Sequence, residues 1–259
     1  MLGALAGDII GSRFEWQNIK TKDFHLFTED SRFTDDSVLT VAQADSLLSG
    51  EPFVQKLKEY FRLYPDAGYG GYFYQWAGSS SVEPYNSFGN GSAMRVSPVG
   101  WYFNDLSTVL NEARHSAAVT HSHPEGIKGA QAVAAAIFMA RNGESKDDIR
   151  KFIEMRFAYD FAWSLDDIRP DYDFDVTCQG SVPQALQAFF ESDGFEDAIR
   201  NAVSIGGDSD TIACITGGVA EAFYGVVPDA IAREVFARLD ENLASVTRRF
   251  MQAVGRQSS

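Results

Sequence analysis

Apolar residues recur with the period of an α-helix through most of this chain, while the alternation expected of half-buried strands is scarce. The stretch 36–48 is one example, because its apolar residues follow the helical spacing and Gly50 supplies a natural C-terminal stop. Another begins after Asp208, a favoured residue at a helix start, and continues through residues 209–224. This pattern predicts an all-α protein. No charge-rich or Pro/Ser-rich linker divides the sequence, so residues 1–259 are expected to form one domain.

Two further local patterns predict where helices begin. Ser181 with Gln184, and Asp193 with Glu196, have the spacing of capping boxes, which would start helices at Pro183 and Phe195 respectively. The stretch 66–91 carries few helix signals but many glycine, serine and aromatic residues. Frequent aromatic residues argue against disorder, so a long ordered loop is expected there.

Charge and cysteine usage restrict the class of protein. The net charge of −14 leaves no basic footprint, which excludes general nucleic-acid binding and an anionic membrane surface. The N-terminal residues lack a basic region, so no signal peptide is expected, and no apolar stretch is long enough to span a bilayer. Cys178 and Cys214 have no metal-site or disulfide spacing and are expected to be buried free thiols. A cytoplasmic protein of unknown oligomeric state is therefore predicted.

Two acidic clusters, about 170 residues apart, each stand just before a helical stretch. One cluster alone is accounted for by helix capping, since Asp and Thr are preferred at helix N-termini. However, a helix needs one cap, and the surplus carboxylates would repel one another unless a cation compensates them. Carboxylate and hydroxyl oxygens suit Mg²⁺ or Mn²⁺. If the fold brings the clusters together, they would form a two-metal hydrolase site. The candidate ligands are Thr34, Asp35, Asp36, Asp208, Asp210 and Thr211.

A glycine-punctuated stretch, residues 86–95, is the candidate anion-binding loop. Such loops direct successive backbone N–H groups at a pyrophosphate, although an ordinary Asn/Gly turn has the same composition. His121 is a candidate donor to a phosphate or ribose oxygen, whereas His123 next to Pro124 equally fits a helix cap. At the N-terminus, Gly3, Gly7 and Gly11 are spaced by four residues, which indicates a helix packed closely against a neighbour.

Taken together, these motifs resemble the ADP-ribosylglycohydrolase family, whose members include the dinitrogenase-reductase-activating glycohydrolase. The resemblance is closest to the compact bacterial branch. The matching motifs occur in family order and are Gly7-Asp-Ile-Ile-Gly-Ser-Arg-Phe-Glu15, Phe33-Thr-Asp-Asp-Ser37, Gly89-Asn-Gly-Ser-Ala-Met-Arg95, Thr120-His121 and Gly206-Gly-Asp-Ser-Asp-Thr211.

The resemblance implies an orthogonal all-α bundle with a binuclear Mg²⁺ or Mn²⁺ centre at the bottom of an ADP-ribose cleft. By motif, the six residues named above would be the metal ligands, and Glu15, on an entrance segment, would approach a metal or the ribose. Glu15, Asp35 and Asp210 are the expected catalytic residues. Those expected to bind substrate are Asn86, Ser87, Phe88, Gly89, Asn90, Gly91 and His121, with Phe88 stacking on adenine and His121 at the phosphates.

The implied reaction is hydrolysis of the glycosidic bond between ADP-ribose and an acceptor, with an arginine-linked protein favoured over a small molecule carrying ADP-ribose. Two alternatives remain at this stage. A two-metal phosphohydrolase would use the same ligands on a nucleotide, and a non-catalytic ADP-ribose-binding module would need only the loop.

Overall fold

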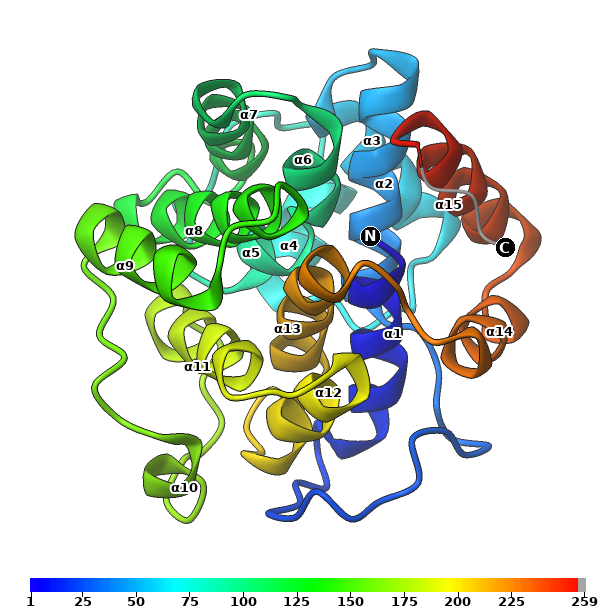
Figure 1. Cartoon of the computed structure of the whole chain (residues 1–259). Coiled ribbons are helices and arrows are strands. Elements are labelled where there is room, and N and C mark those ends of the chain that lie inside the picture. Colours follow the sequence, from blue (N-terminus) through cyan, green and yellow to red (C-terminus); the bar gives the residue numbers. More distant parts are fainter. Residues whose placement is uncertain (256–259) are drawn as a thin grey trace.

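The computed structural model describes residues 1–255, and every regular element within them is a helix (Figure 1). The all-α prediction is therefore confirmed. The elements are α1 (Leu2–Gly11), η1 (Ser12–Phe14), α2 (Asp35–Ser49), α3 (Phe53–Leu63), α4 (Gly71–Gly78), α5 (Gly91–Met94), α6 (Ser97–Tyr102), α7 (Leu106–Ala118), α8 (Pro124–Arg141), α9 (Lys146–Phe157), α10 (Leu165–Ile168), α11 (Cys178–Phe190), α12 (Phe195–Ser204), α13 (Ser209–Tyr224), α14 (Asp229–Arg238) and α15 (Glu241–Ala253). No helix within the described residues is long and apolar enough to cross a membrane.

Helices α1 and α13 lie side by side at the centre of the bundle (Figure 1). The glycines of α1 form the contact, because a Cβ on Gly7 would lie 1.9 Å from the carbonyl oxygen of Ala213. A Cβ on Gly11 would lie 2.5 Å from the carbonyl oxygen of Ser209. No side chain fits at such distances, so the four-residue glycine spacing is a packing requirement. The contact places the end of α1 beside the start of α13.

The remaining helices surround this pair. Helices α8, α11 and α12 pack against α13, while α2 packs against α1, α3, α6 and α15. The buried apolar side chains form one connected cluster that runs through these contacts. The start of α2 is thereby brought to the same end of the central pair as the start of α13.

Several predicted boundaries are confirmed and others are wrong. Helix α13 spans the predicted residues 209–224. Gly50 follows the last residue of α2, as predicted, with a φ of 76° in the left-handed region that favours glycine. The predicted capping box at Ser181 is wrong. Thr177 caps α11 by accepting from the Gly180 N–H, so this helix begins at Cys178 and contains Pro183 within it.

The other two corrections concern α12 and the stretch 66–91. Helix α12 begins at Phe195 as predicted, but the predicted capping box at Asp193 is wrong. Gly194 is the residue before the helix, and no side chain caps it. The stretch 66–91 is not loop throughout, because α4 occupies its middle. Buried Phe73 and Trp76 anchor α4 on the core, which is a tertiary contact that the local sequence does not reveal.

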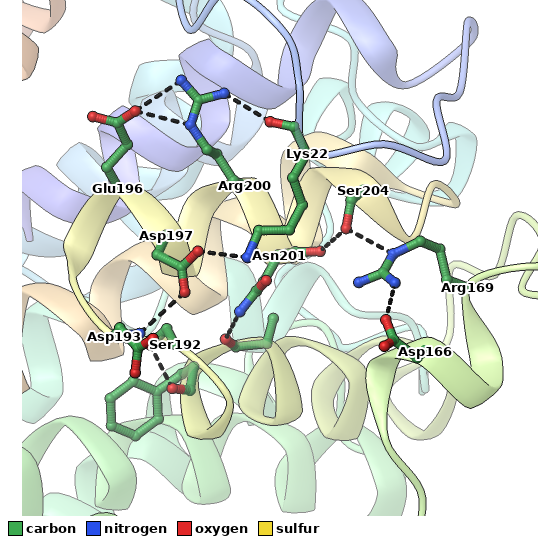
Figure 2. A network of polar contacts seen from close by, with 12 residues as sticks. Lys22, Asp166, Arg169, Ser192, Asp193, Glu196, Asp197, Arg200, Asn201 and Ser204 are labelled. Carbon is green, nitrogen blue, oxygen red and sulfur yellow. Dashed lines mark hydrogen bonds and ion pairs between the residues drawn. The ribbon is translucent and has the colours of Figure 1, made fainter.

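The entrance segment, which we define as residues 15–34, has no helix but is held to α12 by polar contacts (Figure 2). Arg200 donates from Nη1 to the carbonyl oxygens of Lys22 and Phe24, at 2.8 Å each. The Lys22 ammonium in turn pairs with Asp197 at 2.5 Å. These contacts fix the path by which the chain leaves Glu15 and returns to α2.

Candidate active site

The start of α2 is held by Asp8, a fully buried carboxylate on α1. Asp8 accepts from the backbone N–H groups of Thr34 and Ser37, at 3.0 Å each, and from the hydroxyls of the same two residues. Thr34 also caps α2 by accepting from the Asp36 N–H. This buried carboxylate therefore orders the turn that carries Asp35 and Asp36.

A different device holds the start of α13. Gly206 and Gly207 have φ angles of 74° and 73°, in the left-handed region that favours glycine. Asn18 of the entrance segment pairs with Gly207 in both directions, donating to its carbonyl oxygen at 2.9 Å and accepting from its N–H at 2.7 Å. Lys20 donates to the carbonyl oxygen of Ile205 at 2.6 Å. The turn before Asp208 is thus set by backbone conformation and an amide clamp.

These two turns bring together carboxylates that are distant in sequence. Asp8, Asp36 and Asp210 form one group of three whose ligand oxygens lie within 4.8 Å of one another, and Glu15, Asp208 and Asp210 form a second. Asp210 belongs to both groups. One oxygen of Asp36, Oδ1, is buried without a hydrogen-bond partner among the described residues. An all-oxygen donor set with an unsatisfied buried oxygen fits a hard divalent cation such as Mg²⁺ or Mn²⁺.

The carboxylates of the site are electrostatically strained when no cation compensates them. Burial is the largest cause that raises the pKa of Asp35, Asp36, Asp208 and Asp210, and for all except Asp208 repulsion by neighbouring carboxylates is the next cause. Glu15 is less buried, and burial followed by repulsion from the aspartates raises its pKa to about 7. These shifts have the sign that a nearby divalent cation would reverse.

The predicted ligands do not all occupy equivalent places. Asp36, Asp208 and Asp210 lie in the groups of three, whereas Asp35 lines the adjoining cavity outside both groups. The Thr211 hydroxyl donates to Asp36 Oδ2 at 3.1 Å, and that of Thr34 donates to Asp8. Asp8 was not among the predicted metal ligands. Its signal was present, since it is the one charged residue in the apolar stretch 2–11.

Five carboxylates line a cavity of about 480 Å³, which we call the first cavity, and form its acidic wall: those of Glu15, Asp35, Asp36, Asp208 and Asp210. The predicted anion-binding loop also lines it and forms its glycine-rich wall, represented by Ser87, Gly89, Asn90 and Gly91. Aromatic residues from the stretch 69–73 also line it. Asn86 and Phe88 do not, and Phe88 is 46% exposed with its ring 5.4 Å from that of His123. The first cavity therefore combines an acidic wall with a glycine-rich wall.

His121 and Arg95 also line the first cavity. A Cβ on Gly91 would lie 3.2 Å from His121 Nε2, so the missing side chain leaves this nitrogen facing the loop. Burial, and then the charge of Arg95, lowers the pKa of His121, which keeps the imidazole neutral. Thr120 Oγ1 accepts from Arg95 at 2.7 Å and lies 2.7 Å from His121 Nδ1. A Thr120 hydroxyl that donates to Nδ1 leaves the ring proton on Nε2, directed at the cavity.

Arg95 was also not among the predicted site residues. Its guanidinium is fully buried, lines the first cavity and has one nitrogen, Nη1, without a hydrogen-bond partner among the described residues. A buried positive charge next to a glycine-rich loop favours an anion at that loop. Arg95 closes the predicted loop 86–95, but its burial, which sets it apart from an ordinary surface arginine, arises only in the folded chain.

Asn90 connects the two walls directly. Its side-chain nitrogen donates to Asp208 Oδ2 at 2.8 Å and to Ser181 Oγ at 3.0 Å. The hydrogen bond from Asn90 to Asp208 therefore joins the glycine-rich loop to the acidic wall.

A family model described as ADP-ribosylglycohydrolase matches residues 1–259. The chain belongs to the ADP-ribosylglycohydrolase family. Membership makes it an enzyme of the glycosyl hydrolase class.

Individual members of the ADP-ribosylglycohydrolase family are similar to the chain at low identity. It is 24% identical to the ADP-ribosylhydrolase ARH3 of Mus musculus over 339 residues, covering 98% of this chain and 91% of the relative. It is 31% identical to the ADP-ribosylarginine hydrolase Tri1 of Pseudomonas putida (strain GB-1) over 163 residues, covering 58% and 42%. A solved structure, an ADP-ribosylglycohydrolase-related protein complex, matches with a TM-score of 0.71 at 23% identity over 98% of this chain and 97% of that chain. The fold is therefore that of an ADP-ribosylglycohydrolase.

Proposed function

We propose that this enzyme hydrolyses the bond between the anomeric carbon of ADP-ribose and an acceptor, with residues 1–259 acting as one domain. The favoured substrate is a protein carrying ADP-ribose on arginine. The observation that carries the proposal is the pair of three-carboxylate groups sharing Asp210, placed in one cavity with a glycine-rich loop. The similarity to an ADP-ribosylarginine hydrolase supports the choice of arginine.

The acidic wall is the proposed site for two divalent cations, Mg²⁺ or Mn²⁺. Asp8, Asp36 and Asp210 would hold one, and Glu15, Asp208 and Asp210 the other, with Asp35 and the Thr34 and Thr211 hydroxyls as nearby oxygen donors. The chemistry that such cations supply is positive charge, which orients ribose hydroxyls and lowers the pKa of a neighbouring water.

The glycine-rich wall is the proposed site for the diphosphate. Backbone N–H groups of the loop would donate to phosphate oxygens, His121 Nε2–H would add a side-chain donor, and buried Arg95 would stabilise the negative charge. Phe88, at the exposed end of the loop, is retained as the proposed adenine contact. This placement puts the ribose that carries the acceptor against the acidic wall.

Glu15 is the proposed proton carrier. A group whose pKa is about 7 can accept a proton and return it near neutral pH, which is what general acid–base catalysis requires. Water would add its hydroxyl to the anomeric carbon while the carbon–acceptor bond breaks. The proton taken by Glu15 would pass to the leaving nitrogen. The aspartates of the wall would stabilise the positive charge that develops on the sugar in the transition state.

Measurement of ADP-ribose released from an arginine-ADP-ribosylated protein tests the proposal. We expect release with Mg²⁺ or Mn²⁺ and loss of release with EDTA. Release that is unchanged by EDTA would contradict the cation site. Release of inorganic phosphate in place of ADP-ribose would instead favour a phosphohydrolase. Stoichiometric binding without any product would favour a non-catalytic module.

A further inference from the structure

A second cavity, of about 540 Å³, adjoins the same carboxylates. It shares Glu15, Trp16, Asp35, Gly68 and Asp210 with the first cavity. None of the glycine-rich loop, His121 or Arg95 lines it. The acidic wall therefore separates a cavity that has an anion-binding loop from one that does not.

The part of the second cavity that is not shared comes from the end of the entrance segment and from the connection between α3 and α4. It contains two charged side chains besides the shared carboxylates, Asp66 and Arg32, and both are exposed. Phe33 and Tyr64 contribute aromatic rings whose centroids lie 6.0 Å apart in an edge-to-face arrangement. Tyr64 is fixed in place because its hydroxyl accepts from Asn242 Nδ2 at 3.1 Å.

We propose that the second cavity binds the acceptor side of the substrate, and that it is built for the guanidinium group of an arginine. This inference rests on the proposed function. A glycosidic bond has two sides, and if ADP-ribose occupies the cavity with the anion-binding loop, the group leaving the anomeric carbon must lie across the acidic wall.

The charge of the second cavity favours a cation. Four carboxylates line it, those of Glu15, Asp35, Asp66 and Asp210, against the single guanidinium of Arg32. Bound divalent cations would compensate the aspartates of the acidic wall, but Asp66 stands outside both three-carboxylate groups. Those cations would therefore leave the Asp66 carboxylate available to the acceptor. No hydrogen bond within residues 1–255 occupies its side chain.

The shape of the guanidinium group also suits these neighbours. Its planar face packs well on aromatic rings, which Phe33 and Tyr64 supply, while its N–H groups donate to a carboxylate such as Asp66. A serine acceptor is neutral and short, so it would reach the acidic wall without using either feature. The lining thus distinguishes acceptors by charge and length.

The test compares Asp66→Asn with wild type on two peptides, one ADP-ribosylated on arginine and one on serine. We expect a KM roughly 10-fold higher for the arginine-linked peptide, because a charge-assisted hydrogen bond is lost, and little change in kcat. The serine-linked peptide should show no change. Arg32→Gln should act in the opposite direction and lower the KM for the arginine-linked peptide. Asp147→Asn, at an exposed position of α9 outside both cavities, is the matched control.

A binding measurement separates this inference from the proposed function. Agmatine, a small guanidinium compound, should bind to the wild-type protein loaded with ADP-ribose and Mg²⁺, and more weakly to Asp66→Asn. Arginine-linked release with a wild-type KM in Asp66→Asn would overturn the inference and leave the function intact. Absence of ADP-ribose release from every linkage would overturn the function. Agmatine binding of equal strength in the wild-type protein and in Asp66→Asn would overturn the assignment of the second cavity to a guanidinium group.

Discussion

The two helix starts that build the acidic wall have similar sequences but are held in opposite ways. The start of α2 is fixed by a charged group, since buried Asp8 accepts four hydrogen bonds from Thr34 and Ser37. The start of α13 is held without a carboxylate, through the left-handed glycines, the Asn18 amide and the Lys20 ammonium. The start of α2 therefore depends on a carboxylate, the same kind of group that would hold the cations, whereas the start of α13 does not. Substitutions in the two turns should separate folding from cation binding.

The largest effect is expected for Asp210→Asn, because Asp210 belongs to both three-carboxylate groups. ADP-ribose release should fall on the order of 10²- to 10³-fold or more, as for loss of a central electrostatic group. Thermal stability in EDTA should rise, since the substitution removes a buried charge that its neighbours repel. Activity assays and thermal unfolding in EDTA measure the two quantities. A variant that loses activity and stability together would show that Asp210 is mainly structural.

Asp8→Asn should have the next largest effect and should reduce both stability and cation binding. Asparagine can accept through only one oxygen, so part of the hydrogen bonding to the start of α2 is lost, at a cost of about 1–3 kcal/mol. Chemical denaturation in EDTA and Mn²⁺ titration measure the two losses. Weaker Mn²⁺ binding without any change in unfolding free energy would contradict the positioning role of Asp8.

Asn18→Ala should weaken cation binding about 10- to 100-fold, as residues that orient ligands do. It removes both hydrogen bonds to Gly207, while the part-exposed site lets water replace them, so stability should change little. Calorimetric Mn²⁺ titration is the measurement. Gln17→Ala, at an exposed neighbouring position outside both cavities, is the control. Equal Mn²⁺ affinities of Asn18→Ala and Gln17→Ala would show that the hydrogen bonds between Asn18 and Gly207 do not position the start of α13 for cation binding.

The smallest expected effect is on the pH dependence of stability. The pKa of the wall carboxylates is raised in the folded state from ordinary values of 3.8 for Asp and 4.5 for Glu, to about 7 for Glu15. The unfolded chain therefore loses these protons first, and stability in EDTA should fall as pH rises from about 4 through 7. Saturating Mn²⁺ should restore stability, and more so at pH 8 than at pH 5. Melting temperatures measured at both pH values test this. Asp210→Asn should show a shallower slope, and an equal slope would assign the effect to other groups.

Much of the fold and the acidic wall could be predicted from the sequence because their signals are local. Helix periodicity, the glycine after α2 and the two Asp/Thr clusters are readable within a few residues. The start of α11 was predicted wrongly, because packing in the folded chain stabilises a helix that continues through Pro183. Asp8 and Arg95 were not found because their importance comes from burial among residues distant in sequence. The second cavity likewise depends on residues that meet only in the folded chain.

The hydrogen bond from Asn90 to Asp208 has a consequence for any solution measurement. If the loop holds the nucleotide and Asp208 a cation, ordering either partner of this bond changes the free energy of occupying the other site. By thermodynamic reciprocity, the dissociation constant of ADP-ribose would vary with free Mg²⁺ or Mn²⁺ by the same factor as the cation's constant varies with ADP-ribose. Replacing Asn90 with alanine should make this factor smaller, and the part that remains would come from the ribose hydroxyls that the cations orient.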